Sequence, residues 1–145
     1  MTDLRVHYQP VSKRFFGNVA IEGHDTVAYH HEDSLSQHLA IKGTGAFTVQ
    51  WKGAVWRFSN KESRDTFAAN PEKFSPAYNG HCANALSLGE GLIKTDGTHW
   101  EIFDDQLFLF YAARGRNRWL GGDDYRSYKI SADNAWKEIL LMDSN

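Results

Sequence analysis

The clearest pattern of hydrophobic and polar positions lies in residues 45–59, which read GAFTVQWKGAVWRFS. Apolar and polar side chains alternate on both sides of a Lys-Gly pair, and this is the period of a β-strand. The glycine of that pair suits the positive φ that a tight hairpin turn needs. The pattern therefore predicts a β-hairpin with one aromatic face. This face is formed by Phe47, Trp51, Trp56 and Phe58.

A second hairpin is predicted over residues 99–111, HWEIFDDQLFLFY, with an Asp-Asp turn in its middle. Between the two hairpins, residues 59–74 predict a helix. A Ser-Asn pair at its start supplies the cap, and Phe67 is its expected buried anchor. We expect Pro71 to end this helix, because proline cannot continue the backbone hydrogen bonds.

The other segments carry weaker signals. Residues 80–88, GHCANALSL, predict a helix that ends at Gly89, because a left-handed glycine commonly ends a helix. Apolar residues three or four positions apart in residues 123–140 predict an amphipathic C-terminal helix. The remaining expectations are a short strand at 18–21, a helix cap at Asp25, a polar loop at 32–37 and a solvated surface turn at 114–118.

Together these elements predict an α+β protein in which antiparallel β-hairpins pack against several short helices. The 145 residues are an ordinary length for one domain. We expect the domain to cover residues 18–145 and to follow an N-terminal arm at residues 1–17. No internal repeat is expected.

Composition narrows the classes of function. The net charge is −2, which gives no electrostatic reason to expect binding to nucleic acid or to an acidic membrane surface. Cys82 is the only cysteine, which excludes an internal disulfide and a CxxC zinc pattern. No apolar run reaches the length of about 18 residues that a membrane span needs. The N-terminal residues lack the apolar segment of a secretion signal, so we expect a cytoplasmic protein with no membrane partner.

Three segments carry a family resemblance: IEGHDTVAYH, WKGAVWRFSNKESRDTFAANPEKFSPAYNGHCANA and LFLFY. With these motifs in this order, the chain resembles the YHS domain family, in particular its larger stand-alone members. The resemblance runs from about residue 18 to the C-terminal helix and implies a YHS-type single domain. The matched positions are Ile21, Gly23, Asp25, Val27, Ala28, Tyr29, Gly53, Phe58, Ser59, Arg64, Phe67, Asn70, Pro71, Phe74, Pro76, Tyr78, Gly80, Cys82 and Ala83.

The resemblance implies a metal site only for short members of the family, which carry cysteines at two positions. One of these positions is Ala28 in this chain, and the other lies in the helix after the first hairpin, which has no cysteine. That ligand set is therefore absent here, and the Cys82 of the larger members remains. The chain also departs from the larger members at His24 and His81, where the family pattern has tyrosine.

Cys82 has three interpretations, which the sequence leaves open. A free cysteine is often a small buried side chain that only packs. It becomes a metal ligand or a nucleophile when a helix N-terminus lowers the pKa of its thiol. His81 lies beside it in sequence, but adjacent residues on a helix point in different directions. A thiol nucleophile would therefore need His24 as its base.

If the two histidines lie close together, they convert a tyrosine-lined pocket into a cluster of His24, His81 and Cys82. Nitrogen and sulfur donors suit zinc or copper, which are therefore the expected metals. The leading hypothesis is a non-enzymatic module that binds a transition metal or a small ligand near Cys82. A small thiol-dependent enzyme and a purely structural or interaction domain are the alternatives. The candidate ligand-binding residues are Asp25, Tyr29 and Tyr78.

Overall fold

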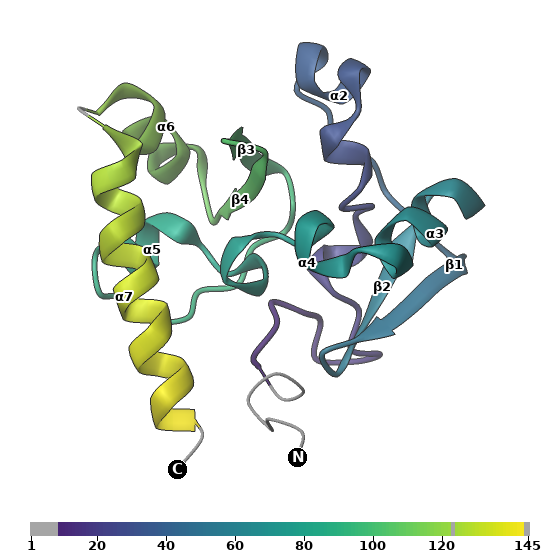
Figure 1. Cartoon of the computed structure of the whole chain (residues 1–145), viewed down its shortest axis with the longest axis horizontal. Coiled ribbons are helices and arrows are strands. Elements are labelled where there is room, and N and C mark those ends of the chain that lie inside the picture. Colours follow the sequence, from purple (N-terminus) through teal and green to yellow (C-terminus); the bar gives the residue numbers. More distant parts are fainter. Residues whose placement is uncertain (1–8, 123, 144–145) are drawn as a thin grey trace.

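The protein has an α+β fold built on two antiparallel hairpins, as the hydrophobic pattern predicts (Figure 1). The computed structural model describes residues 9–122 and 124–143. The first hairpin consists of β1 (Thr44–Trp51) and β2 (Ala54–Phe58), and the second of β3 (His99–Phe103) and β4 (Gln106–Phe110). Both turns are tight, because both residues of each turn have a left-handed backbone that matches the twist of a hairpin. The φ values are 51° and 71° for Lys52 and Gly53, and 50° and 65° for Asp104 and Asp105.

The helix predicted after the first hairpin is also present. It is α3 (Lys61–Ala69), and the side-chain oxygen of Asn60 caps it by accepting a hydrogen bond from the backbone N–H of Ser63 at 2.8 Å. Pro71 separates α3 from the short helix α4 (Pro71–Phe74), because proline is favoured at the first position of a helix and excluded from its interior. The second part of the chain contains α5 (Ala83–Ser87), α6 (Ala113–Gly121) and α7 (Tyr125–Asp143).

Three predictions of local structure are wrong. Residues 32–37 form the helix α2 (Glu32–Gln37), because two acidic residues in its first turn interact favourably with the helix dipole. Residues 114–118 are helical within α6, where the buried Trp119 anchors the helix against the interior. Residues 18–21 form isolated bridges and no strand, since Ile21 adopts a left-handed backbone with φ of 53° and begins the 3₁₀ turn η1 (Ile21–Gly23).

The predicted N-terminal arm is packed where the structure describes it, and its residues 1–8 lie outside the described residues. Val11 belongs to the hydrophobic core. The backbone N–H of Ser12 donates to the carbonyl oxygen of Asn79 at 3.0 Å, and that of Ile21 donates to the carbonyl oxygen of Ser12 at 3.0 Å. The packed part of the chain therefore begins before residue 18. Within the described ranges, no helix combines the length and apolar character needed to cross a membrane.

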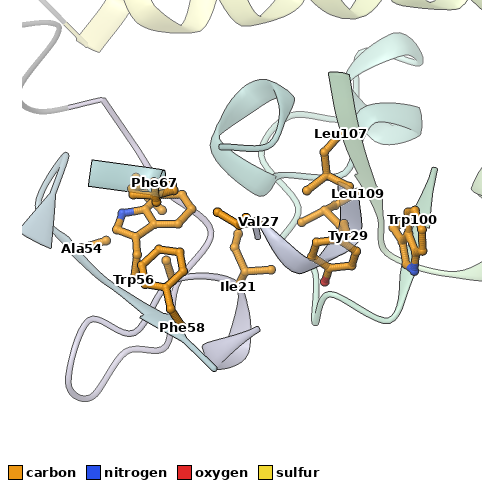
Figure 2. Packing of buried hydrophobic residues seen from close by; sticks show 12 residues of the cluster. Ile21, Val27, Tyr29, Ala54, Trp56, Phe58, Phe67, Trp100, Leu107 and Leu109 are labelled. Carbon is orange, nitrogen blue, oxygen red and sulfur yellow. The ribbon is translucent and has the colours of Figure 1, made fainter. Parts of the chain in front are cut away.

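The first of two core clusters lies between the two hairpins. Figure 2 shows Ile21 and Val27 between the rings around Phe67 and the group that contains Tyr29 and Leu109. The predicted aromatic face of the first hairpin is confirmed on β2, where Trp56 and Phe58 are fully buried. Trp51 and Phe47 on β1 are half-buried and pack against the same cluster.

Strand β4 lies between the two clusters and contributes to both. Leu107 and Leu109 point into the first cluster. Phe108 and Phe110, which alternate with them along the strand, belong to the second cluster with Trp119. Both faces of β4 are therefore buried, and the two cores share this strand.

The order of the elements repeats in the structure, although the sequence predicts no internal repeat. A left-handed turn, short helical segments, a hairpin and a longer helix follow one another in residues 19–74 and again in residues 77–143. We call these segments the first half and the second half. Helices α3 and α6 each span nine residues and start after equivalent strands.

Equivalent ring contacts stabilise both halves. In the first half, the ring of Phe67 on α3 lies 5.6, 5.2 and 5.0 Å from the rings of Trp51, Trp56 and Phe58. In the second half, the ring of Trp119 on α6 lies 6.2, 5.5 and 5.6 Å from the rings of Phe103, Phe108 and Phe110. Because the two halves share this order of elements and these ring contacts, their equivalent positions can be compared.

Candidate functional site

The two candidate histidines close the same kind of backbone turn. We call residues 21–24 the first turn motif and residues 78–81 the second; the second overlaps the 3₁₀ turn η3 (Ala77–Gly80). Each motif has three successive left-handed residues, the third of them glycine, followed by a histidine with an extended backbone. The motifs touch, because a Cβ atom at Gly80 would overlap the Cδ1 atom of Ile21. The φ values are 53°, 50° and 81° for Ile21, Glu22 and Gly23, and 58°, 51° and 88° for Tyr78, Asn79 and Gly80.

Each histidine is held by its own turn motif. The Nδ1 atom of His24 lies 3.0 Å from the carbonyl oxygen of Ile21, and the Nδ1 atom of His81 lies 3.0 Å from the carbonyl oxygen of Tyr78. Because a carbonyl oxygen only accepts, Nδ1 carries the proton in both rings. Burial lowers the pKa of both histidines, and the hydrogen bond to the carbonyl partly opposes this effect. Both rings therefore stabilise a turn in their neutral form.

Lowering the pH below about 6.5 should destabilise the protein. The unfolded chain takes up a proton at each histidine near this pH, whereas burial lowers the pKa of His24, His30 and His81 in the folded protein. The folded state then binds fewer protons, so stability present above the unfolded pKa is lost as the pH falls. The loss is at most about 1.4 kcal/mol per pH unit for each histidine.

Urea unfolding at about pH 7.5 and about pH 5.5 measures this loss. The His24→Tyr variant should show a weaker pH dependence, because tyrosine does not titrate in this range. His31→Gln is the control, since His31 is the exposed neighbour of His30. Equal stability of the native chain at the two pH values would contradict the prediction.

The predicted His–His–Cys cluster is not assembled. Within residues 9–122 and 124–143, no group of three or more His, Cys, Asp or Glu side chains is placed to hold a metal ion. Cys82 is the N-cap of α5, and its Sγ atom accepts a hydrogen bond from the backbone N–H of Ala85 at 3.5 Å. Zinc or copper binding by His24, His81 and Cys82 stays a prediction without support from this geometry.

Two of the predicted ligand-binding residues, Tyr29 and Tyr78, are bonded within the fold. The hydroxyl of Tyr29 donates to the carbonyl oxygen of Gly97 at 2.6 Å. The hydroxyl of Tyr78 donates to the Oδ1 atom of Asp133 at 2.7 Å. Tyr78 also lines a polar cavity of about 280 Å³. Burial raises the pKa of both phenols, so each acts as a neutral donor.

The third predicted ligand-binding residue, Asp25, joins the parts of the first half and has no exposed surface. Its Oδ1 atom accepts hydrogen bonds from the backbone N–H groups of Val27 and Ala28, each at 3.0 Å. The predicted hydrogen bonds to backbone N–H groups are therefore present, but the N-cap of the 3₁₀ turn η2 (Ala28–His30) is Val27 and not Asp25. Its Oδ2 atom accepts from the backbone N–H and the hydroxyl of Ser59 at 2.9 and 2.8 Å. We call these four hydrogen bonds the Asp25 latch, because they connect the first turn motif to the end of β2.

Cys82 occupies the equivalent position in the second half. The backbone N–H of Asp25 donates to the carbonyl oxygen of Ile41 at 2.8 Å, and that of Cys82 donates to the carbonyl oxygen of Ile93 at 2.8 Å. Tyr111 follows β4 where a serine follows β2, and its side chain is 66% exposed. Among the residues that the structure describes, no hydrogen bond joins Cys82 to Tyr111. The second half therefore lacks a latch.

A cavity of about 800 Å³ lies where this latch is absent. Cys82, which is only 3% exposed, lines it from the start of α5, and Tyr111 and Ala112 line it from the start of α6. The volume is within the range of about 300–1,000 Å³ that small-molecule sites occupy. We call this space the Cys82 cavity. Its apolar wall is formed by Ala85, Leu88 and Ile93.

Two arginines of α6 border the cavity, and neither is paired with a carboxylate in the described part of the chain. Arg118 donates to the Oδ1 atom of Asn84 at 2.6 Å and to the Oγ atom of Ser87 at 2.9 Å, which are both neutral groups. Arg114 is exposed and has no hydrogen bond or ion pair among the described residues. Glu90 also lines the cavity, so the two arginines give its lining an excess of one positive charge.

Sequence reasoning missed Tyr111, Arg114 and Arg118, which it assigned to a strand end and a surface turn. A usable signal was present, because a Gly-His pair recurs at 23–24 and 80–81, and an Ile-Lys pair recurs at 41–42 and 93–94. Aligning these pairs would have placed Cys82 opposite Asp25 and revealed the missing latch.

Similarity to known proteins gives no independent indication of function. The resemblance described above rests on the motifs of the sequence, and the site rests on the geometry of its second half. No family model, no curated protein and no solved structure matches the chain.

Proposed function

We propose that this protein is a YHS-type binding domain whose small-molecule ligand occupies the Cys82 cavity. The observation that carries the proposal is the cavity of about 800 Å³ that Cys82 lines. The ordered motifs around Gly23, Phe58 and Cys82 support the family assignment. The structural equivalence of Cys82 and Asp25 supports the location, since the chain fills this position with hydrogen bonds in one half and leaves space in the other.

Binding is favoured over thiol catalysis by the partners of Cys82. A thiol nucleophile needs a base within hydrogen-bond reach. Within the described ranges, the only hydrogen bond to the Sγ atom comes from the backbone N–H of Ala85. His81 directs Nδ1 to its own turn motif, as His24 does. We therefore assign Cys82 the role of a wall residue and not of a nucleophile.

The accessibility of Cys82 in the folded protein tests the proposal. Iodoacetamide should alkylate Cys82 in the native full-length chain, because Cys82 lines a space large enough for this reagent. The rate should be lower than in the denatured chain, since little of the side chain is exposed. Intact-mass measurement over time gives both rates, and Cys82→Ser is the control for reaction at other residues.

The dependence on denaturant separates the two routes to the sulfur. Alkylation through the cavity should be insensitive to low urea concentrations, whereas alkylation through global unfolding accelerates with urea. If native Cys82 reacts only at the rate of global unfolding, the sulfur does not face an accessible cavity and the proposal is wrong.

A further inference from the structure

We infer that the ligand of the Cys82 cavity carries a carboxylate, which lies where the first half places the carboxylate of Asp25. This inference rests on the proposed function and names the chemical class of its ligand. Its basis is the difference between two equivalent positions of one chain. The first half has the carboxylate of Asp25 at this position, whereas the second half has the thiol of Cys82.

The first half supplies its own oxygen atoms at this position. The carboxylate of Asp25 accepts four hydrogen bonds, two from the start of η2 and two from Ser59. The side-chain oxygen of Asn60 accepts a further bond at the start of α3. The donors around the first latch are therefore satisfied by the chain itself, and the first half needs no ligand there.

The second half has replaced both oxygen-bearing side chains. Cys82 stands in place of Asp25, and its sulfur accepts one long hydrogen bond from Ala85. Ala112 is the N-cap of α6 in place of Asn60, and it gives the helix no side-chain cap. The cavity lies between these two residues. The two positions at which the second half lacks the side-chain oxygen atoms of the first half thus line the same cavity.

The charge of the cavity favours a carboxylate over a neutral acceptor. Arg114 and Arg118 border the same space, and the hydrogen-bond partners of Arg118 are neutral. Arg116, which lies between them in sequence, is instead paired with Glu101. Guanidinium groups bind carboxylates through two parallel hydrogen bonds. Glu90 is the acidic residue on the cavity wall; it is exposed and has no ion pair within the described part of the chain.

The apolar lining of the cavity indicates that the ligand also has an apolar part. Leu88 and Ile93 also line the cavity, and Leu88 is 51% exposed. A small monocarboxylic acid with an apolar ring or chain fits this combination of one charged edge and one apolar wall.

Titration of the full-length chain with benzoate, benzamide and inorganic phosphate tests the inference. Benzoate should shift the backbone amide resonances of Cys82, Ala112 and Gly115 in ¹H–¹⁵N spectra. Benzamide has the same ring without the charge, and its affinity should be lower than that of benzoate by about tenfold or more. The Arg114→Gln variant should weaken benzoate binding by about tenfold and leave benzamide unchanged. Lys137→Gln, an exposed charge change on α7, should alter neither.

A second pair of variants tests the position of the carboxylate. Ala112→Asn restores the cap that α3 has and should weaken benzoate binding, because its amide oxygen occupies the place of a ligand oxygen. Ala113→Asn lies one position beyond the cap and is the matched control. The double change Cys82→Asp with Tyr111→Ser rebuilds the latch and should abolish benzoate binding while far-ultraviolet circular dichroism stays native.

The possible outcomes separate the inference from the proposed function. Equal binding of benzoate and benzamide at these amides would overturn the carboxylate and leave the binding cavity in place. If phosphate shifts these amide resonances in the native chain but not in Arg114→Gln, and benzoate shifts them in neither, the carboxylate is wrong and the ligand carries a phosphate. If neither organic probe shifts these resonances, the inference is wrong, and the alkylation of Cys82 decides separately on the cavity.

Discussion

Replacing Phe67 or Trp119 with alanine should destabilise the protein by about 3–5 kcal/mol in each case, because each ring is the fully buried anchor of its half. Each packs against three aromatic rings of its hairpin, so truncation leaves a cavity that the neighbours cannot fill. The two losses should be similar, since the two anchors have equivalent positions. Chemical denaturation of the two variants measures both values.

Leu120→Ala is the control for this pair. Leu120 follows Trp119 in α6 and is 47% exposed, so its truncation should cost below about 1 kcal/mol. A loss below about 1 kcal/mol for Trp119→Ala would mean that the second core does not depend on its anchor. The two halves would then have similar geometry, but their anchor residues would contribute differently to the free energy of unfolding.

Replacing Asp25 with alanine should destabilise the protein by roughly 3–5 kcal/mol, because it removes the acceptor of four hydrogen bonds inside the protein. The backbone N–H of Val27 would remain buried without a partner, and that of Ala28 would keep only its hydrogen bond to the carbonyl oxygen of Asp25 at 3.2 Å. The end of β2 would lose its connection to the first turn motif. Urea denaturation of the variant at neutral pH gives the loss directly.

Cys82→Ala is the matched control at the equivalent position. The sulfur accepts one weak hydrogen bond, so its removal should cost below about 2 kcal/mol. Similar losses for the two variants would contradict the assignment of the latch to the first half alone. A stable Asp25→Ala protein would show that the latch does not hold the hairpin in place.

The hairpins could be predicted because their evidence is local. Alternating side chains and turn residues determine the strands from β1 to β4, and the aromatic face of β2 follows from the same period. Asn60 and Pro71 likewise act on the residues next to them, so the boundaries of α3 follow from sequence.

The turn motifs could not be predicted from local preferences. Ile21 and Tyr78 are bulky residues with positive φ, a conformation that such residues rarely adopt, and the sequence around Ile21 therefore indicated a strand. The histidines that follow were interpreted by their capacity to bind metal. Their Nδ1 atoms instead bind carbonyl groups three residues earlier, an interaction that exists only once the backbone is left-handed.

The cavity could not be predicted because it forms where the starts of α5 and α6 meet, and these segments are far apart in sequence. Ala112 provides no cap, and Gly115 lies close enough to Asn84 that a Cβ atom there would displace it. Periodicity describes one segment at a time and does not indicate that the starts of α5 and α6 meet. The recurring Gly-His pair was the available long-range signal.

The burial of β4 on both faces limits how the chain can be divided. A fragment that contained the first half alone would lack Leu107 and Leu109, and the apolar surface of Ile21 and Val27 would face water. Such a fragment should aggregate when produced by itself and recover its fold when mixed with the separately produced second half. The chain would then behave as a covalently linked heterodimer, in which one strand of the second half completes the core of the first half.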